Sequence, residues 1–375
     1  MAIPSRFRNP IDDPDPALVA QYRRLFTRGV GSPSPAQVEL LARALERGDP
    51  LADACVSAPS DAATRALLDQ CREVPLWVDV EALSLGARTA RRAGVIGNFV
   101  LADFALMGGY RSAAIAKALV STGELTTATA RRLIHTGAYV GLVQRAGAIL
   151  PGGEAWDATL RVRMVHARVR ASLSRDWDHA RWGVPLNQAD TLGTNLLFST
   201  GFLEGCKQWG LRFSRDEEEA LVHLWRYVGY LMGIDEALLP VDAAGGRRAL
   251  YLVGLSQPAP SEDSRRLARS LYELPITFAR KGWRRRIARA EMAVRLGMTR
   301  RLLGDESVDQ LGLPASAARA ALTPIIGVIR AVEGVRMRVP GGTRAAYRIG
   351  DLVLSAGERL AQQLIESAAL KANVG

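Results

Sequence analysis

The sequence contains few cysteines, and their arrangement excludes a disulfide-built scaffold. Among 375 residues there are three, Cys55, Cys71 and Cys206, at irregular spacings. An odd number of widely separated cysteines argues against a disulfide framework and favours a reducing compartment.

Long apolar runs are also absent. The chain lacks the uncharged apolar stretch of about 18 residues that indicates a membrane-spanning helix. Its first residues, MAIPSRFRNPIDDPDP, are polar and broken by proline, unlike the apolar centre of a secretory signal. We therefore expect a cytoplasmic protein. Hydropathy does not detect an amphipathic helix lying on a membrane, so a peripheral membrane contact stays open.

Aromatic residues and strand-like patterns are scarce, which favours helices. Aromatics make up 6% of the chain and hydrophobic residues 48%, with few Val/Ile/Thr segments of alternating polarity. The apolar content is sufficient for a sizeable core. The composition predicts an all-α protein with a single large helical domain, globin-like only in the way its helices pack.

The charge is strongly positive, with 49 basic and 38 acidic residues and a net charge of +11. The densest cluster, 280–286, includes Trp283 between basic residues. No recognisable nucleic-acid-reading module accompanies it. We therefore predict no specific nucleic-acid partner and interpret the cluster as a solvated helix face.

The chain divides into three parts. Residues 1–74 form an N-terminal helical arm, with Ser34 as a helix N-cap and no group of evident chemistry. Residues 75–255 form the apolar core, and 256–375 form a C-terminal helical extension with helices near 262–280, 283–303, 314–337 and 344–371.

Two further helices in the core carry clear boundary signals. A helix starts near Asn187 and ends at Gly210. The next begins with Ser214 and Glu217, which match a capping box, and ends near Gly233. The second of these is the firmest helix prediction.

Two of the four histidines lie on a predicted helical hairpin. Residues 125–148 carry Arg132, His135 and Thr136 at spacings that place them on one helix face, and 155–175 carry His166. Proline and glycine at 151–153 form the turn. Both histidines are then roughly 18 to 21 Å from the bend, level with each other. A flat group fits between them only if the helices splay.

Several other chemistries lack their motifs. The chain has no GxSxG, no strand followed by GxGxxG, no Glu-x-x-His pair, no zinc-type spacing, and no CxxCH for covalent haem attachment. We expect His179 to be solvent-exposed or hydrogen-bonded and His223 to make a buried polar contact between helices. Non-covalent haem, which needs one imidazole on a helix, is permitted by these residues but not demanded by them.

Three segments carry a family resemblance: RVRMVHARVR, WGVPLNQADTLGTNLLFS and EALVHLWRYVGYLMGIDEALLP. They resemble the latex clearing protein and MpaB-type oxygenase family across roughly 75–255. The resemblance implies an all-helical domain that holds b-type haem and cleaves carbon–carbon double bonds of isoprenoid chains with dioxygen. It places the proximal haem ligand on His166, and the distal arginine and threonine on Arg132 and Thr136.

Two departures from the family pattern affect the implied chemistry. His135 stands where rubber-cleaving members have lysine, so it either binds the haem iron distally or hydrogen-bonds a bound oxygen species. The segment 112–119 has no carboxylate where those members have a glutamate base, and Glu124, the nearest one, has a different spacing. The same proton transfer is therefore not assumed.

The resulting prediction is a haem b oxygenase acting with dioxygen on a small, apolar, unsaturated, isoprenoid-like substrate. His166 is the proximal iron ligand, and Arg132, His135 and Thr136 line the distal side. One alternative is a non-catalytic protein in which His135 and His166 both hold the haem for electron transfer or sensing. Another is a cofactor-free interaction protein whose arginine-rich surface binds acidic partners. The sequence leaves the electron donor and oligomeric state open.

Overall fold

The computed structural model is helical throughout the residues that it describes, which confirms the all-α prediction. It describes residues 3–26, 29–121, 125–279 and 282–372, of which 125–128, 278 and 360–372 are described by their backbone only. No strand occurs in these ranges. The helices are α1 (Pro16–Leu25), α2 (Pro35–Ala44), α3 (Pro50–Ser57), α4 (Asp61–Arg72), α5 (Val80–Arg92), α6 (Gly94–Val100), the π-helix η1 (Leu101–Leu106), α7 (Met107–Gly109), α8 (Ala113–Ser121), α9 (Leu125–Val143), α10 (Glu154–Leu173), the 3-10 helix η2 (Ser174–Asp176), α11 (His179–Trp182), α12 (Gln188–Leu196), the π-helix η3 (Leu197–Gly201), α13 (Phe202–Gln208), α14 (Arg215–Leu231), α15 (Ala243–Leu255), α16 (Glu262–Tyr272), α17 (Leu274–Phe278), α18 (Trp283–Leu303), α19 (Asp305–Gln310), α20 (Ala318–Arg338) and α21 (Gly342–Ala372).

One hydrophobic core joins all parts of the chain. Leu18 near the N-terminus, Leu224 in α14 and Ile326 in α20 belong to the same cluster of buried side chains. The protein is therefore a single helical domain.

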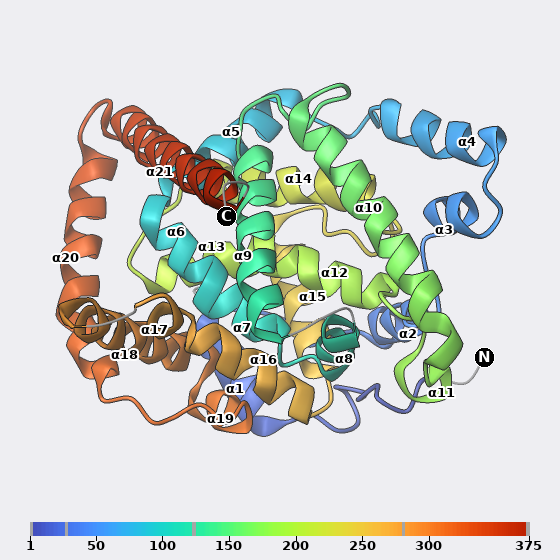
Figure 1. Cartoon of the computed structure of the whole chain (residues 1–375), viewed down its shortest axis with the longest axis horizontal. Coiled ribbons are helices and arrows are strands. Elements are labelled where there is room, and N and C mark those ends of the chain that lie inside the picture. Colours follow the sequence, from blue (N-terminus) through green and yellow to red (C-terminus); the bar gives the residue numbers. More distant parts are fainter. Residues whose placement is uncertain (1–2, 27–28, 122–124, 280–281, 373–375) are drawn as a thin grey trace.

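Helix α14 lies at the centre of this domain (Figure 1). It packs along α5 and also contacts α10, α12 and α15. Its residues from Ala220 to Leu231 are buried apart from His223 and Arg226, and a helix that is apolar around most of its circumference is stable only when neighbours surround it. The α9–α10 hairpin lies in front of α12 and α14 in this view, and α21 returns across the molecule to pack on α5 and α6.

The predicted helix starts in the capped segments are confirmed. Ser34 makes a capping box with Gln37 at the start of α2. At the start of α14 the Ser214 hydroxyl accepts from the Glu217 amide at 3.1 Å, and the Glu217 carboxylate accepts from the Ser214 amide at 2.8 Å. Each cap satisfies two amides that have no partner within the helix.

The segment from Asn187 to Gly210 is helical as predicted, but it consists of three consecutive pieces. Asn187 caps α12, the π-helix η3 follows, and α13 completes the segment. Gly210 ends it with a φ of +97°.

The segment between α5 and α9 bends sharply. Among the described residues no single helix has the length and apolar composition to cross a membrane, but the bent pair Gly94–Gly109 and Ala113–Ser121, with 97° between its halves, passes that test together.

In the C-terminal part, two predicted helices differ from the structure. The helix predicted over 262–280 ends at Tyr272, and α17 starts at Leu274. Pro275 lacks an amide hydrogen, so it fits the first turn of a new helix better than the interior of a long one. The helix predicted from 314 starts at Ala318, after Gly312 with a φ of +70° and Pro314.

Candidate functional site

The hairpin of α9 and α10 is closed at its turn and open farther away. Gly152 in the turn has a φ of +83°, a left-handed conformation that glycine adopts at little cost. Near the turn, the Tyr139 and Thr159 hydroxyls are hydrogen-bonded at 3.1 Å. Beyond that contact the two helices diverge, with α10 leaning away from α9 (Figure 1). The backbones of the two helices are thus splayed on the side away from the turn.

Helical spacing places both hairpin histidines near the faces that make this contact. His135 precedes Tyr139 by one turn and His166 follows Thr159 by two. The distances along the helix axes are roughly 6 Å and 10 Å. The histidines are therefore offset by about 4 to 5 Å along their helices instead of level, because α9 ends at Val143, earlier than the sequence suggested.

His166 lies in the middle of the buried face of α10 but is not fully buried. Its neighbours on that face are tightly enclosed: Thr159 is 0%, Arg163 2% and Arg170 6% exposed. The His166 side chain itself remains partly accessible. The His166 ring can therefore be reached by a group bound beside α10.

The electrostatic surroundings hold the His166 imidazole in its neutral form. Burial, and then the positive charge of Arg170, lower the pKa of His166 to about 4, while Asp49 acts weakly in the opposite direction. Its ring makes no hydrogen bond or ion pair within the described part of the chain. A neutral imidazole in this state keeps a nitrogen lone pair that can bind a metal ion.

Two arginines fix α10 on either side of His166. Arg163 donates to both carboxylate oxygens of Asp49, at 2.6 and 2.9 Å, and to the Leu231 carbonyl at 3.2 Å. Arg170 donates to Asp53 at 2.8 Å and to the Leu186 carbonyl at 2.6 Å. Because the two arginines are spaced three before and four after His166, they hold its helix turn in place from both ends.

Sequence reasoning missed these anchors. Asp49 caps α3 and Asp53 lies in its first turn, in the N-terminal part for which no chemistry was predicted. The available signal was the pair of arginines at helical spacing from His166 and the pair of aspartates at i and i+4 in another segment. Neither pattern alone shows that the two meet.

On α9, the predicted residues differ in exposure. Arg132 is partly buried and donates to the Leu119 carbonyl and the Thr129 hydroxyl, both at 3.4 Å. Thr136 is partly buried, and His135 is exposed. Arg132 and Thr136 thus lie on the inner side of the helix, with His135 at its edge. Glu124, the alternative base, lies outside the described residues.

The remaining histidines have the structural roles predicted for them. His179 is exposed and its Nε2 lies 3.1 Å from the Ser174 carbonyl. His223 is half-buried, accepts a hydrogen bond from the Asp79 amide at 2.9 Å, and packs edge-on against Trp77. It therefore connects α14 to the start of α5.

The residues described by the structure contain no group of three His, Cys, Asp or Glu side chains that could hold a bare metal ion. A single histidine such as His166 holds iron when a prosthetic group supplies the other ligands, as the porphyrin of haem does. The donor set at His166 fits haem better than it fits an isolated metal ion.

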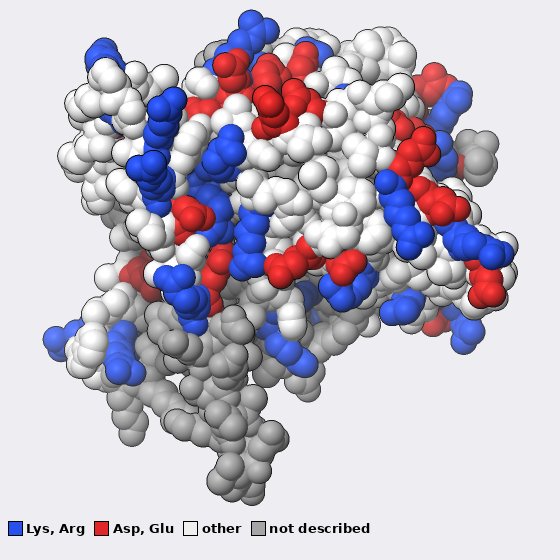
Figure 2. All heavy atoms as spheres, turned by 90° about the horizontal axis from the view of Figure 1, so that it is seen from above, with Lys and Arg blue, Asp and Glu red and all other residues white. Residues whose placement is uncertain are grey.

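The arginine excess is partly structural. Arg92 pairs with Glu217 at 3.2 Å and Arg300 with Asp309 at 2.6 Å, and both guanidinium groups are buried. On the face drawn in Figure 2, basic and acidic side chains are intermixed, without a broad surface of one sign. In the basic cluster, Trp283 is 67% exposed.

Comparisons with known proteins agree with this architecture. The family model described as "ER-bound oxygenase mpaB/B'/Rubber oxygenase, catalytic domain" matches residues 93–334. A rubber oxygenase from a Streptomyces species is 28% identical over 208 residues, which are 53% of this chain and 50% of that protein. The chain thus spans about half the length of the curated relative it matches.

A solved structure shares the fold. The structure of latex clearing protein in its closed state superposes with a TM-score of 0.61 at 20% sequence identity, covering 84% of this chain and 88% of the other. The family model matches well over half of this chain. The chain therefore belongs to the family of mpaB/B'-type ER-bound oxygenases and rubber oxygenases, through their catalytic domain.

Proposed function

We propose that this chain is a haem b-dependent oxygenase that acts on an apolar, unsaturated, isoprenoid-like substrate, with His166 as the proximal iron ligand. The observation that carries the proposal is the state of His166. Its imidazole is neutral, has no protein partner among the described residues, and is accessible in the middle of a buried helix face.

The surroundings of His166 suit a large apolar prosthetic group. The hairpin diverges beyond the Tyr139–Thr159 contact. Partly buried apolar side chains on both helices, including Leu133 and Met164, pack towards the main core. An apolar enclosure with one imidazole ligand is the usual protein contribution to b-type haem binding.

The chain's own residues would then set the polarity of the opposite wall. Arg132 contacts the Leu119 carbonyl near the end of α8, and its charge would orient polar groups of a bound molecule. The Thr136 hydroxyl makes no side-chain hydrogen bond within the described residues, so it can donate one to a bound molecule. His135, at the edge of α9, would control access to the proposed haem site or enter it.

The substrate class comes from the relatives. One is named a rubber oxygenase and the other a latex clearing protein, and rubber is an unsaturated isoprenoid polymer. Bound haem would supply the dioxygen chemistry. Cleavage of a carbon–carbon double bond by one dioxygen molecule places one oxygen atom in each of two carbonyl products, so it needs no external reductant. We propose the cytoplasm as the compartment, supported by three unpaired cysteines.

The haem proposal is tested by visible spectroscopy of the purified protein, reconstituted with hemin where needed. We expect a Soret band in the wild type and its loss in His166→Ala. His179→Ala is the matched control, because that histidine is exposed and touches only a backbone carbonyl. A colourless wild type after reconstitution, or an unchanged spectrum in His166→Ala, would overturn the assignment.

The oxygenase proposal is tested separately. Haem-loaded protein given squalene, an unsaturated isoprenoid, should consume dioxygen and form carbonyl products detectable by mass spectrometry. The same protein given squalane, the saturated analogue, should do neither. Haem-loaded protein that turns over neither squalene nor a shorter isoprenoid alkene contradicts the substrate class and leaves the haem assignment intact.

The second candidate is a non-catalytic protein with haem held by two histidines. The location of His135, one helical turn from Tyr139, supports this candidate, because Tyr139 contacts the helix that carries His166. Carbon monoxide separates the two functions. If the reduced wild type binds carbon monoxide readily, the oxygenase is supported. If only the His135→Ala variant binds it, the two-histidine protein is supported.

A further inference from the structure

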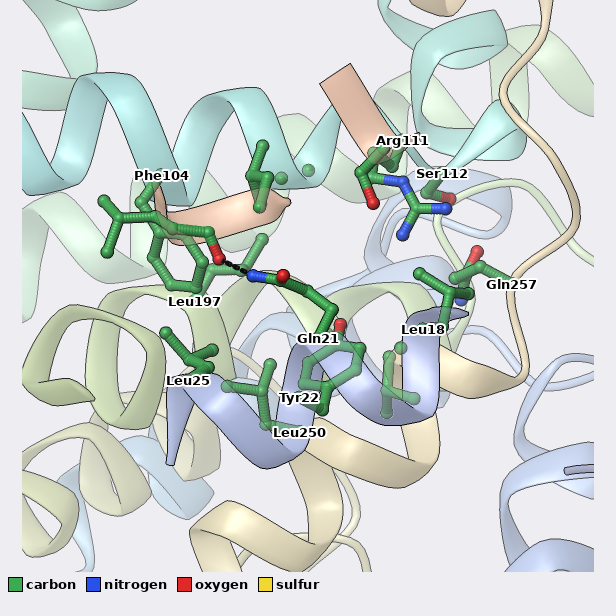
Figure 3. A pocket seen from close by; sticks show the side chains of 18 of the residues that line it. Leu18, Gln21, Tyr22, Leu25, Phe104, Arg111, Ser112, Leu197, Leu250 and Gln257 are labelled. Atoms are coloured by element: carbon green, nitrogen blue, oxygen red, sulfur yellow. Dashed lines mark hydrogen bonds between the residues drawn. The ribbon is translucent and has the colours of Figure 1, made fainter. Parts of the chain in front are cut away.

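A cavity lies between α1, η1 and α18. It has a volume of about 60 Å³ and is lined by residues of α1, η1, α12, α15 and α18 together with the turn at 111–112. Neither His135 nor His166 lines it. Figure 3 shows Arg111, Ser112 and Gln257 gathered at one end of this cavity and Phe104, Leu197 and Leu25 at the other. The cavity is therefore polar at one end and apolar at the other.

The polar end contains a buried guanidinium that lacks a counter-charge. Arg111 is 9% exposed. The charges of Asp15 and Glu306 act against the lowering of its pKa by burial, but neither carboxylate lies within ion-pair distance of it in the described chain. Its Nε has no hydrogen-bond partner, and its one hydrogen bond, to the Gln310 side-chain oxygen, is long at 3.4 Å. A guanidinium stays charged in proteins, and a buried charge without a partner is costly.

The charged groups that line the cavity favour a ligand with a single negative charge. Asp190 also lines the cavity, but it pairs with Arg6 at 2.7 Å and both side chains are buried. Of the charged side chains that line the cavity, Arg111 is therefore the one without an ion-pair partner among the described residues, and Asp15 and Glu306 offset its charge only from beyond ion-pair distance. One negative charge would balance it, whereas a doubly charged phosphate would be repelled by Asp190.

Other donors at the site favour a carboxylate. Ser112 lies just before α8, its hydroxyl accepts from the Ile115 amide at 3.4 Å, and its own proton can be donated into the cavity. Burial raises the pKa of Tyr22, so its hydroxyl keeps its proton. The two carboxylate oxygens could accept from Arg111 and one of these hydroxyls, and Leu18, Leu197 and Leu250 would surround an apolar chain.

We propose that this cavity binds a monocarboxylate that carries a short apolar chain, with Arg111 as the residue that recognises the carboxylate. Neither His135 nor His166 lines the cavity, so the inference is argued from its own lining residues and does not depend on the proposed haem function. Its volume admits the head group and the first carbons, while the rest of the chain would lie in the cavity mouth. The alternative occupant of the cavity is a small cluster of water molecules, which this volume also accommodates.

Isothermal titration calorimetry of the full chain at neutral pH tests the proposal, with hexanoate as the probe. Hexanol keeps the apolar chain without the charge, acetate keeps the charge without the chain, and inorganic phosphate provides a different anion. We expect one hexanoate per chain, bound at least tenfold more tightly than each comparator. Against hexanol the reason is the charged hydrogen-bonded pair, which contributes about that factor or more; against acetate it is the burial of the apolar chain, at about 0.8 kcal/mol per CH2 group.

Substitution of the recognising residue provides the second part of the test. Arg111→Gln should weaken hexanoate binding at least tenfold. Arg43→Gln, an exposed arginine on α2 that pairs only with Glu39, removes the same net charge and should leave binding unchanged. If Arg111→Gln fails to fold, the comparison of hexanoate with hexanol on the wild type still decides.

Three results would overturn the proposal. No saturable binding of hexanoate means that the cavity holds water only. Equal affinity for hexanol and hexanoate excludes recognition of the carboxylate. Equal hexanoate affinity in the wild type and a folded Arg111→Gln excludes Arg111 as its partner. Haem content is recorded on the same samples, so loss of haem and loss of hexanoate binding are separate readouts.

Discussion

The buried ion pair between Arg163 and Asp49 should be the strongest single support of the helix that carries His166. Both side chains are enclosed, with 2% and 7% of their surfaces exposed. Replacing Arg163 by methionine keeps much of its length but leaves the Asp49 carboxylate buried without its partner. Removal of one member of a buried pair costs about 3 to 5 kcal/mol. The loss is a large part of the roughly 5 to 15 kcal/mol by which domains are stable.

The assay is urea unfolding followed by far-ultraviolet circular dichroism, arranged as a double-mutant cycle. Arg163→Met and Asp49→Leu should each lower the free energy of unfolding by about 3 kcal/mol or more. The double variant should be far less destabilised than the sum, because an apolar pair of similar volume replaces a buried ion pair at little net cost. Arg43→Met is the control, since its pair with Glu39 is exposed and should contribute less than about 1 kcal/mol.

Two outcomes refute this reasoning. One is a single variant that loses less than about 1 kcal/mol, which would place the pair among ordinary surface ion pairs. The other is a double variant whose loss equals the sum of the two single losses, which would mean that the two side chains do not act together.

Two further predictions concern the same region. In the cofactor-free protein, the unfolded chain takes up a proton at His166 near its ordinary pKa of 6.5 and the folded chain only near 4, so stability falls as the pH falls through this window. We expect the free energy of unfolding of the wild type to fall by about 2 kcal/mol more than that of His166→Gln between pH 7 and pH 5, measured from urea midpoints. The same pH dependence of the free energy of unfolding in the two proteins would contradict this prediction. Gly233 has a φ of +77°, and a Cβ there would lie 2.4 Å from the Asp49 carboxylate. Gly233→Ala should therefore destabilise by about 1 to 3 kcal/mol more than Gly341→Ala, which has a similar φ and open space, in thermal unfolding of the two variants; equal midpoints would show that the contact does not matter.

Local signals in the sequence predicted much of the fold. Ser34 and Ser214 carry their capping partners three residues away, so each helix start is encoded within one turn. The hairpin turn is encoded in the same way, by Pro151 and the two following glycines. These features need no knowledge of distant parts of the chain, and the structure confirms them.

The contacts that build the sites could not be predicted in this way. Asp49 and Arg163 are 114 residues apart, and Arg111 meets Gln310 across 199 residues. Helical periodicity shows which face each residue occupies but not which other face it meets. The end of α9 at Val143 likewise depends on how the chain packs into the turn. Because α9 ends earlier than the sequence predicted, His135 and His166 are offset along their helices.

Two ion pairs fix the position of the helical turn that carries His166 before any ligand binds. Arg163 ties α10 to Asp49 and to the end of α14 through the Leu231 carbonyl, and Arg170 ties it to Asp53 and the Leu186 carbonyl. Each of these contacts would be broken if α10 shifted relative to α3 and α14. Since breaking the buried Arg163–Asp49 pair costs about 3 to 5 kcal/mol, the folded chain keeps α10, and with it the His166 imidazole, in one position. Ligand sites require this preorganisation, because a side chain held in place before binding loses little conformational entropy when the ligand arrives.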